Sequence, residues 1–524
     1  MSSQIVRNTA VVSSMTLISR VLGLVRDMVF ARFGVGVGMD AFLVAFKIPN
    51  FMRRLFAEGA FSQAFVPVLT EYKTTNSEAE VKALVDRVAG TFIGILGLLT
   101  LVGVLASPLL VILFAPGFID ETEKFNLTAQ MLRFTFPYLM FMALVAFSAG
   151  ILNSYGKFGA AAFTPVWLNV VLIAAALWIA PGLDEPMLAL AWGVLVAGFV
   201  QLLFLLPALH SIRLLPRPRW GLRDPGVRKI MKLMVPGIIG SSVAQINLLF
   251  DTLIASFLIT GSVSWLYFAD RLVEFPLGIF GIALATVILP LLAKKHASGE
   301  TKAFSQTIDT GMRWVLLIGL PATVGLILLA EPAIITLFHY DEFSKQDVSM
   351  ASLALVAYAT GLPGFMLVRV LAPAFYARQD TRTPVRIAIT AMVANMVMNV
   401  LFVVPLLLMD IEGAHAGLAL ATALASMLNA GLLYYRLRRS GVFMPLPGWK
   451  VFALRLFIAN LLMALVLIWG IPASIDWLSM QGRQRILQLV LWVMAGAGVY
   501  LLALRVSGLR LSMIWSPTGS SGDT

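Results

Sequence analysis

Long apolar runs recur along the whole chain, and short polar connections separate them. Fourteen of these runs reach about 20 residues, the length with which an α-helix crosses roughly 30 Å of hydrocarbon. Their approximate centres are residues 24, 50, 100, 140, 172, 198, 245, 280, 322, 362, 395, 424, 461 and 495. The pattern predicts an all-α polytopic membrane protein with fourteen transmembrane helices.

Three of these apolar runs carry several charged residues in their interior. A charge at the centre of a bilayer costs about 2.5–3.5 kcal/mol, so it is kept only where it meets water, a partner or a ligand. The charges are Arg20, Arg26 and Asp27 in the first run, Arg53, Arg54 and Glu58 in the second, and Asp270, Arg271 and Glu274 in the eighth. They must face an interior rather than lipid, and this favours a transport function.

Composition supports a membrane protein and excludes other classes. Of the 524 residues, 59% are hydrophobic and 13% are charged, and a soluble domain of this length would not tolerate that balance. The net charge of +12 is spread over short loops rather than gathered on one face, so we expect no nucleic-acid partner. There is no cysteine, and therefore no disulfide or thiol site.

The loops alternate in charge, and this alternation predicts the topology. The connection after the sixth span carries seven basic residues and one acid, whereas connections after odd-numbered spans lean acidic, for example Asp184 and Glu185 after the fifth. Basic residues also follow the eighth, tenth and twelfth spans, for example Lys294, Arg378 and Arg436. Under the positive-inside rule, the even-numbered loops and both termini lie in the cytoplasm.

A shift of 224 residues aligns the chain with itself. It places Asp27 on Asp251, Lys47 on Arg271 and Phe51 on Phe275, although chance among apolar letters is the alternative. A repeat of six spans predicts two pseudo-symmetric six-helix lobes that face one another across a cleft. The predicted parts are residues 1–220, 221–440, a pair of further helices in 441–510 and a cytoplasmic tail in 511–524.

The arginines near this cleft indicate the chemistry of the ligand. Arg20, Arg26, Arg53 and Arg271 occupy the spans where the two lobes should face. A guanidinium donates two parallel hydrogen bonds to phosphate and keeps its charge when buried, so the substrate is expected to be a phosphorylated anion. Internal salt bridges or snorkelling to a headgroup are the structural alternative.

Other polar residues in apolar spans are candidates for a cation site. Asp251 lies in the seventh span, and Asn395 and Asn399 lie one turn apart in the eleventh. Oxygen side chains bind a hard cation or receive a proton, although hydrogen bonding between helices explains them equally well. We find no Walker A, HExxH or dinucleotide-binding sequence, so no catalytic residue and no cofactor is predicted, and energy must come from gradients.

Three segments resemble a known family. SRVLGLVRD at 19–27, MDAFLVAFKIPNFMRRLFAEGAFSQAFVP at 39–67 and GSVSWLYFADRLVEFPLGIFGIALATVILP at 261–290 are similar to the MurJ (MviN) family of bacterial lipid II flippases. That family belongs to a superfamily that includes multidrug exporters and polysaccharide flippases. The resemblance extends from the first span through at least the twelfth.

The resemblance implies a central cationic cavity between the lobes and a groove for the lipid tail at the last two helices. It implies that Arg20, Arg26, Arg53 and Arg271 engage the diphosphate and sugar headgroup, beside Asp27. Further residues near the portal or cavity would be Ser19, Asp40, Glu58 and Glu274. A sodium ion would lie at Asp251, Asn395 and Asn399, with Thr422 as a further ligand, although an acid at 399 would make a stronger site.

We therefore expect a flippase of the bacterial cytoplasmic (inner) membrane that carries lipid II from the inner to the outer leaflet for peptidoglycan synthesis. Its partners would be lipid II and membrane lipids, its coupling ion Na+ or H+, and it would act as a monomer without enzymatic activity. One alternative is an exporter of drugs or of another lipid-linked oligosaccharide, although a drug antiporter would favour acids over arginines. Another is an enzyme acting on the same lipid, which would need catalytic carboxylates in a sizeable loop.

Overall fold

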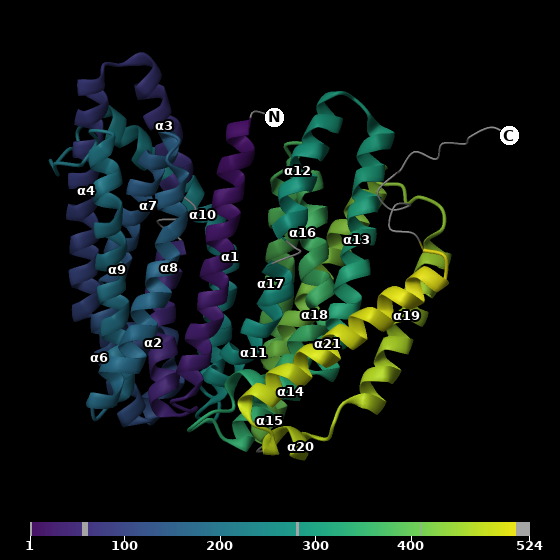
Figure 1. The fold of residues 1–524 in the computed structure, drawn as a ribbon. Coiled ribbons are helices and arrows are strands. Elements are labelled where there is room, and N and C mark those ends of the chain that lie inside the picture. The colour runs from purple at the N-terminus through teal and green to yellow at the C-terminus, as the bar shows by residue number, and fades with distance from the viewer. Residues whose placement is uncertain (1–2, 55–60, 279–281, 410, 510–524) are drawn as a thin grey trace. The chain divides into compact units, whose positions relative to one another are not determined.

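The computed structural model describes residues 3–54, 61–278, 282–409 and 411–509, and these residues are overwhelmingly helical (Figure 1). They divide into two compact units, one of residues 1–264 with 340–343, and one of residues 265–339 with 344–524. Each unit is described by itself. The all-helical fold expected from the apolar runs is confirmed for the described residues.

The first unit contains ten helices. Three of them, α4, α7 and α3, meet at an aromatic core in which Phe61 stacks 5.0 Å from Phe65 and lies 4.5 Å from Phe92. The helices are α1 (Ser3–Ala31), α2 (Val37–Arg53), α3 (Ser62–Thr75), α4 (Glu78–Leu105), α5 (Ser107–Phe114), α6 (Thr122–Thr135), α7 (Tyr138–Ser154), α8 (Phe158–Ala174), α9 (Pro186–Ser211) and α10 (Pro225–Ala255).

The second unit contains the remaining helices, although α11 begins just before the boundary. They are α11 (Ser262–Pro276), α12 (Ile282–Ala297), α13 (Thr301–Leu328), α14 (Ala330–Phe338), α15 (Lys345–Thr360), α16 (Leu362–Tyr376), α17 (Arg382–Leu408), α18 (His415–Arg439), α19 (Trp449–Gly470), α20 (Ser474–Ser479) and α21 (Gly482–Val506). The long helices α19 and α21 lie side by side, and the Tyr500 hydroxyl of α21 donates to the Leu317 carbonyl of α13 at 2.8 Å.

Local sequence explains several helix boundaries. Ser77 and Glu80 form a capping box that begins α4, and Ser344 and Asp347 form another that begins α15. The Asp224 carboxylate caps α10, whose first residue is Pro225, a residue that the first turn of a helix tolerates.

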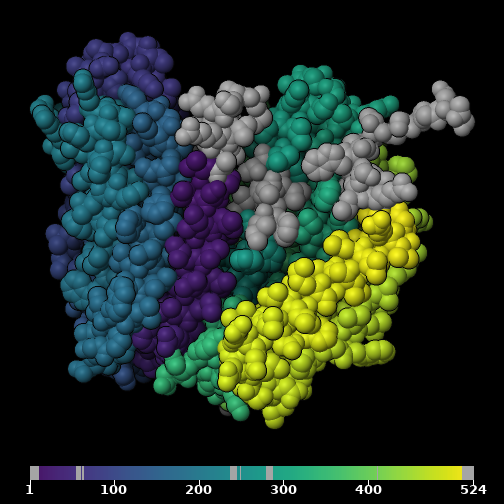
Figure 2. All heavy atoms as spheres, viewed as in Figure 1, coloured from purple at the N-terminus to yellow at the C-terminus, as the bar shows by residue number. Residues whose placement is uncertain are grey.

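Ten helical segments of the described chain are long and apolar enough to cross a membrane. They correspond to the predicted spans centred at 100, 140, 172, 198, 322, 362, 395, 424, 461 and 495. The middle of α21 exposes large apolar side chains, with Leu487, Met494 and Leu502 each more than three-fifths exposed, as suits a helix in contact with lipid. Figure 2 shows this helix in yellow on the surface of the molecule.

The other four predicted spans are helical but less simple. Charges interrupt the apolar face of α1, and α2 has only 17 residues. α10 is helical throughout, whereas the predicted span around residue 280 is divided between α11 and α12, on either side of residues that lie outside the described part. The count of fourteen spans therefore stays a prediction.

The order of helices repeats along the chain. With the 224-residue shift, the starts of α2, α4, α6, α7 and α8 fall within one residue of the starts of α11, α13, α15, α16 and α17. The repeat is therefore visible in the positions of whole helices as well as in a few matching residues. The division into lobes at residues 220 and 440 stays a prediction, and the compact units divide the chain at other positions.

Arg485 fixes the beginning of α21 within the second unit. Its buried guanidinium donates to the carbonyls of Trp477 at 3.1 Å, His339 at 2.9 Å and Leu478 at 3.0 Å. These carbonyls lie in α20 and at the end of α14, where the helix dipole favours a cation. One side chain thus joins α14, α20 and α21.

We expect Arg485→Ala to lower the free energy of unfolding by about 2–3 kcal/mol, because carbonyl oxygens that accept from a charged donor are left without it. The thermal unfolding midpoint of the purified protein in detergent measures this effect. Arg483→Ala, an exposed position on the same turn, is the matched control and should leave the midpoint unchanged. Equal losses in both variants would contradict the role of Arg485.

Candidate functional site

The charged face of α1 forms a compact polar cluster within the first unit. The Nε and one terminal nitrogen of Arg26 donate to Asp27 Oδ1 at 3.0 and 2.7 Å, and both side chains are buried. The other terminal nitrogen donates to Asn169 Oδ1 of α8 at 3.1 Å. Asn169 Nδ2 in turn donates to the Ser19 carbonyl at 3.0 Å, so α8 orients the guanidinium across α1.

Two further residues lie beside Asn169 and Arg26. Gly23 faces Asn169, and a Cβ at Gly23 would lie 3.9 Å from the amide nitrogen, which is ordinary contact. The guanidinium of Arg26 also lies 5.4 Å from the centre of the Phe30 ring. A carboxylate, an amide and an aromatic ring therefore surround one arginine, whose charge is retained and whose position is fixed.

The other candidate arginines of this unit are more accessible. Arg20 is half-buried on α1 and makes no hydrogen bond or ion pair with the residues that the structure describes. Arg53 is also half-buried, and its Nε donates to Asn50 Oδ1 at 3.1 Å. Arg54 is exposed, which agrees with the snorkelling alternative.

Asp40, a candidate for the portal or cavity, belongs to a second polar cluster of the first unit. It is fully buried, and its carboxylate accepts from Gly261 N at 2.7 Å, Ser264 N at 3.0 Å and Ser264 Oγ at 2.6 Å. These donors lie at the start of α11, so Asp40 acts as a helix cap from a distant part of the chain.

A buried lysine completes this second cluster. Lys124 Nζ of α6 lies 3.4 Å from Asp40 Oδ2 and 3.3 Å from Glu121 Oε1, and it is 1% exposed. It donates to the Thr260 hydroxyl at 3.1 Å and lies 4.3 Å from the centre of the Phe118 ring. One network of ion pairs and hydrogen bonds therefore joins the starts of α2 and α6 to the segment that follows α10.

The candidate residues of the second unit form two smaller groups. Arg271 donates to Glu274 Oε2 at 2.8 Å and to the Tyr267 hydroxyl at 3.1 Å, as spacings of three and four residues on one helix allow. Asn399 Nδ2 donates to Asn395 Oδ1 at 3.1 Å, and Asn395 Nδ2 donates to Thr422 Oγ1 at 3.2 Å.

Two of the predicted sites combine residues of both units. Asp251 of the predicted cation site lies in the first unit, whereas Asn395 and Asn399 lie in the second. Likewise, Arg26 lies in the first unit and Arg271 in the second. Glu58 lies outside the described residues. Within the described residues, no cluster of three or more His, Cys, Asp or Glu side chains could hold a metal ion.

Sequence reasoning missed Asn169, Lys124 and Tyr267. Asn169 is the one amide within the apolar run 158–174, and Lys124 is a lone base among Asp120, Glu121 and Glu123. Both departures from their surroundings were visible signals. Their partners lie far away in the chain, however, so only the fold assigns them.

These helices and buried charges define a multi-pass membrane protein of the transporter class. Among solved structures, the chain is similar to "Lipid II flippase MurJ, inward closed conformation", with a TM-score of 0.78 and 26% identity over 94% of this chain and 98% of that one. An inward-facing multidrug transporter of the MATE family, 16% identical with a TM-score of 0.66, shares the fold over 83% of this chain and 98% of its own.

Sequence comparison gives the same result. The family described as "Lipid II flippase MurJ" matches residues 29–483. A probable lipid II flippase MurJ of Vibrio cholerae is 47% identical over 99% of both chains, and one of Haemophilus influenzae is 45% identical over 95% of this chain and 98% of its own. The chain belongs to the MurJ lipid II flippase family, as the three sequence motifs indicated.

The Asp40–Lys124 pair gives a test of the second cluster. We expect Lys124→Met to lower the free energy of unfolding by about 3–5 kcal/mol, because Asp40 would remain buried without its cation. Adding Asp40→Asn should recover much of this loss, since no uncompensated charge remains. The thermal midpoints of the wild type, both single variants and the double variant measure the coupling, and strictly additive losses would contradict it.

Proposed function

We propose that this protein is a lipid II flippase, which moves the undecaprenyl-diphosphate-linked peptidoglycan precursor from the cytoplasmic to the periplasmic leaflet by alternating access. Its family membership, at 47% identity over nearly the whole chain, supports the substrate. The observation that carries the chemistry is Arg26, a buried guanidinium that Asp27 and Asn169 hold in place on α1.

The proposed role of the arginines follows from their chemistry. The diphosphate loses water when it leaves the aqueous phase, and guanidinium groups replace those hydrogen bonds with charge-assisted ones. Arg26 is already oriented, whereas Arg20 and Arg53 are accessible enough to turn toward a ligand. Arg271, beside Tyr267 and Glu274, would be the contribution of the second unit. The polyprenyl tail would stay in lipid throughout.

The finer architecture is part of the same proposal. We infer fourteen spans in two six-helix lobes with two further helices, both termini in the cytoplasm, and a central cationic cavity. The helix order that repeats after 224 residues supports the two lobes, and the basic ends of α12 and α18 support the orientation. The protein would act as a monomer, and no covalent bond of the substrate would change.

The cycle needs a bias, which a cation would provide. Either Na+ or H+ would favour one conformation by binding it more tightly than the other. Asp251 would supply the charge, and Asn395, Asn399 and Thr422 would supply neutral oxygens. The membrane potential could contribute as well, at about 2.3 kcal/mol per charge for each 100 mV.

The direct test measures which leaflet holds lipid II in cells depleted of their own flippase. An externally added agent that cleaves only outward-facing lipid II should act when the wild-type protein is present. With Arg26→Ala we expect a reduction of at least about tenfold, because a charge-assisted hydrogen-bond donor is lost. Arg32→Ala, which removes an exposed arginine just beyond α1, is the matched control and should support normal cleavage.

Two outcomes would contradict the proposal. Normal cleavage with Arg26→Ala would remove the arginine from the site. If the wild-type protein inserts correctly but restores no cleavage, the substrate is a different lipid-linked sugar or a drug.

The coupling ion is tested in the same cells. If Na+ is the ion, its replacement by choline at constant pH should slow the appearance of outward lipid II, and Asp251→Asn should abolish the dependence on Na+. If H+ is the ion, collapse of the pH gradient should have this effect and Na+ removal should not. Insensitivity to both treatments would contradict cation coupling through Asp251.

A further inference from the structure

A short motif occurs twice, once after α9 and once after α18. Pro216, Pro218 and Trp220 have the spacing P-x-P-x-W, and Pro445, Pro447 and Trp449 repeat it. Each copy lies in the connection between one long helix and the next, α9 to α10 and α18 to α19. The motif therefore marks equivalent positions in the two halves of the chain.

In the first half, an aspartate of α4 holds the motif. Asp86 is buried, and its carboxylate accepts from the backbone N–H of Arg217, the residue between the two prolines, at 2.7 Å. The Asp86 carbonyl accepts from Arg219 N at 2.9 Å. The segment lies so close to α4 that a Cβ at Gly90 would be 2.3 Å from the Arg219 carbonyl oxygen.

In the second half, Asp309 of α13 has the same function. Its Oδ1 accepts from the N–H of Leu446, again the residue between the prolines, at 3.0 Å, and from Trp449 Nε1 at 2.7 Å. Its Oδ2 accepts from Arg313 Nε at 2.7 Å. Arg313 also donates to the Pro447 carbonyl at 3.1 Å and lies 5.0 Å from the centre of the Trp449 ring.

The two copies differ in what stands between the prolines and the tryptophan. The first half has Arg217 and Arg219, whereas the second has Leu446 and Gly448, and Gly448 adopts a left-handed conformation with φ +90°. Trp220 lies against Gly94 and is 63% exposed, but Trp449 is drawn inward by Asp309. The second copy therefore has apolar walls around a fixed indole.

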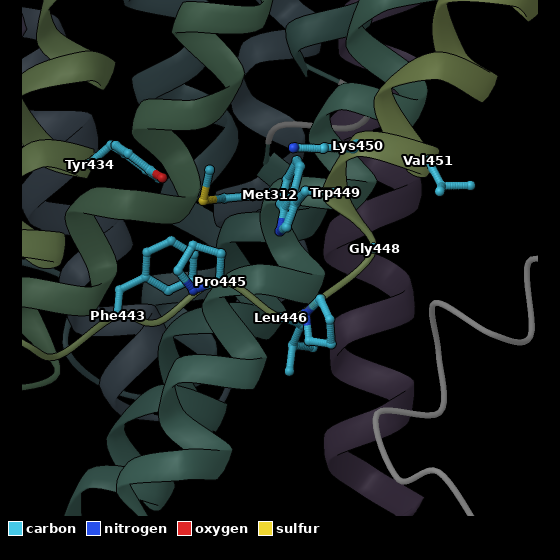
Figure 3. A pocket seen from close by; sticks show the side chains of 10 residues that line it. Met312, Tyr434, Phe443, Pro445, Leu446, Gly448, Trp449, Lys450 and Val451 are labelled. Carbon is cyan, nitrogen blue, oxygen red and sulfur yellow. The ribbon is translucent and has the colours of Figure 1, made fainter.

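These side chains line an open pocket of about 720 Å³ (Figure 3). Met312 of α13, Phe443 and Pro445 of the connection, and Trp449 surround it, with Tyr434 of α18 at one side and Lys450 beside Trp449. A second groove of about 240 Å³, between α13 and α19, shares Trp449 and is lined by Leu316, Leu320, Phe452 and Leu456. Apolar surface therefore continues from the pocket along the helices.

Basic residues lie at the pocket and close to it. Lys450 lines the pocket and is exposed, and Arg438 of α18 donates to the carbonyl of the lining residue Phe443 at 3.5 Å. Arg436 and Arg439 lie in the same last turn of α18. None of these four side chains forms an ion pair with an acid in the described part of the chain. An apolar slot beside uncompensated cations, at the end of membrane helices, matches the chemistry of a lipid with a negatively charged headgroup.

We propose that this pocket is a binding site for an anionic glycerophospholipid, with an acyl chain along the groove between α13 and α19 and its phosphate at Lys450. The Asp309 contacts preform the site, so little ordering is required on binding. The lipid would come from the leaflet at the end of α18, which the loop charges place on the cytoplasmic side. The site is separate from the arginines of α1 and does not depend on the flipping of lipid II.

The test uses the full-length protein in phosphatidylcholine nanodiscs that contain a trace of phosphatidylglycerol with a photoreactive acyl chain. After irradiation, we expect peptide mass spectrometry to find the label in residues 443–451 and along α13 or α19. Lys450→Gln should reduce labelling about fivefold, the effect of one cation near the headgroup. Lys345→Gln, which removes another exposed lysine, should not change it.

Three results would overturn the proposal. Equal labelling by photoreactive phosphatidylcholine would show an ordinary boundary lipid. Unchanged labelling in Lys450→Gln would remove the headgroup contact. Displacement of the label by undecaprenyl phosphate, but not by unlabelled phosphatidylglycerol, would assign the pocket to a polyprenyl lipid instead.

Discussion

The cost of holding charge in an apolar interior is the constraint on which this structure depends. A buried ion without compensation costs several kcal/mol, so an opposite charge or several hydrogen bonds must compensate each one. Lys124 and the N–H groups at the start of α11 compensate Asp40. Arg313 and the segment before α19 compensate Asp309. The buried charges thus determine which distant segments are joined.

The same constraint explains how far the fold was predictable. Ten of the predicted spans are apolar enough for length and hydropathy to identify them. Of the remaining four, α1 and α11 carry charges and α2 is short, and both features weaken the pattern there. Hydropathy identifies lipid-facing helices reliably. It identifies helices with functional polar residues less reliably, because those residues lower the hydropathy of the helix.

The site was predictable where the partners are close in sequence. The contact of Arg271 with Glu274 follows from their spacing of three residues on one helix. Arg26 and Asp27 are neighbours in the sequence, and adjacent residues do not face each other on a helix, so spacing does not predict their ion pair. Asn169 and Lys124 act across the fold, and nothing in a single sequence assigns their partners. The motif P-x-P-x-W was equally visible in the letters. Its meaning became clear only when Asp86 and Asp309 were found at equivalent places in α4 and α13.

The contacts of Asp40 have a consequence for the order in which the protein is made. Its partners Gly261 and Ser264 follow it by 221 and 224 positions, so a ribosome produces α2 long before the helix start that Asp40 caps. Lys124 emerges much earlier than these donors, and its ammonium can neutralise the carboxylate during the interval. The Asp40–Lys124 ion pair can therefore form before the donors at the start of α11 have been made, and the carboxylate can cap that helix only afterwards.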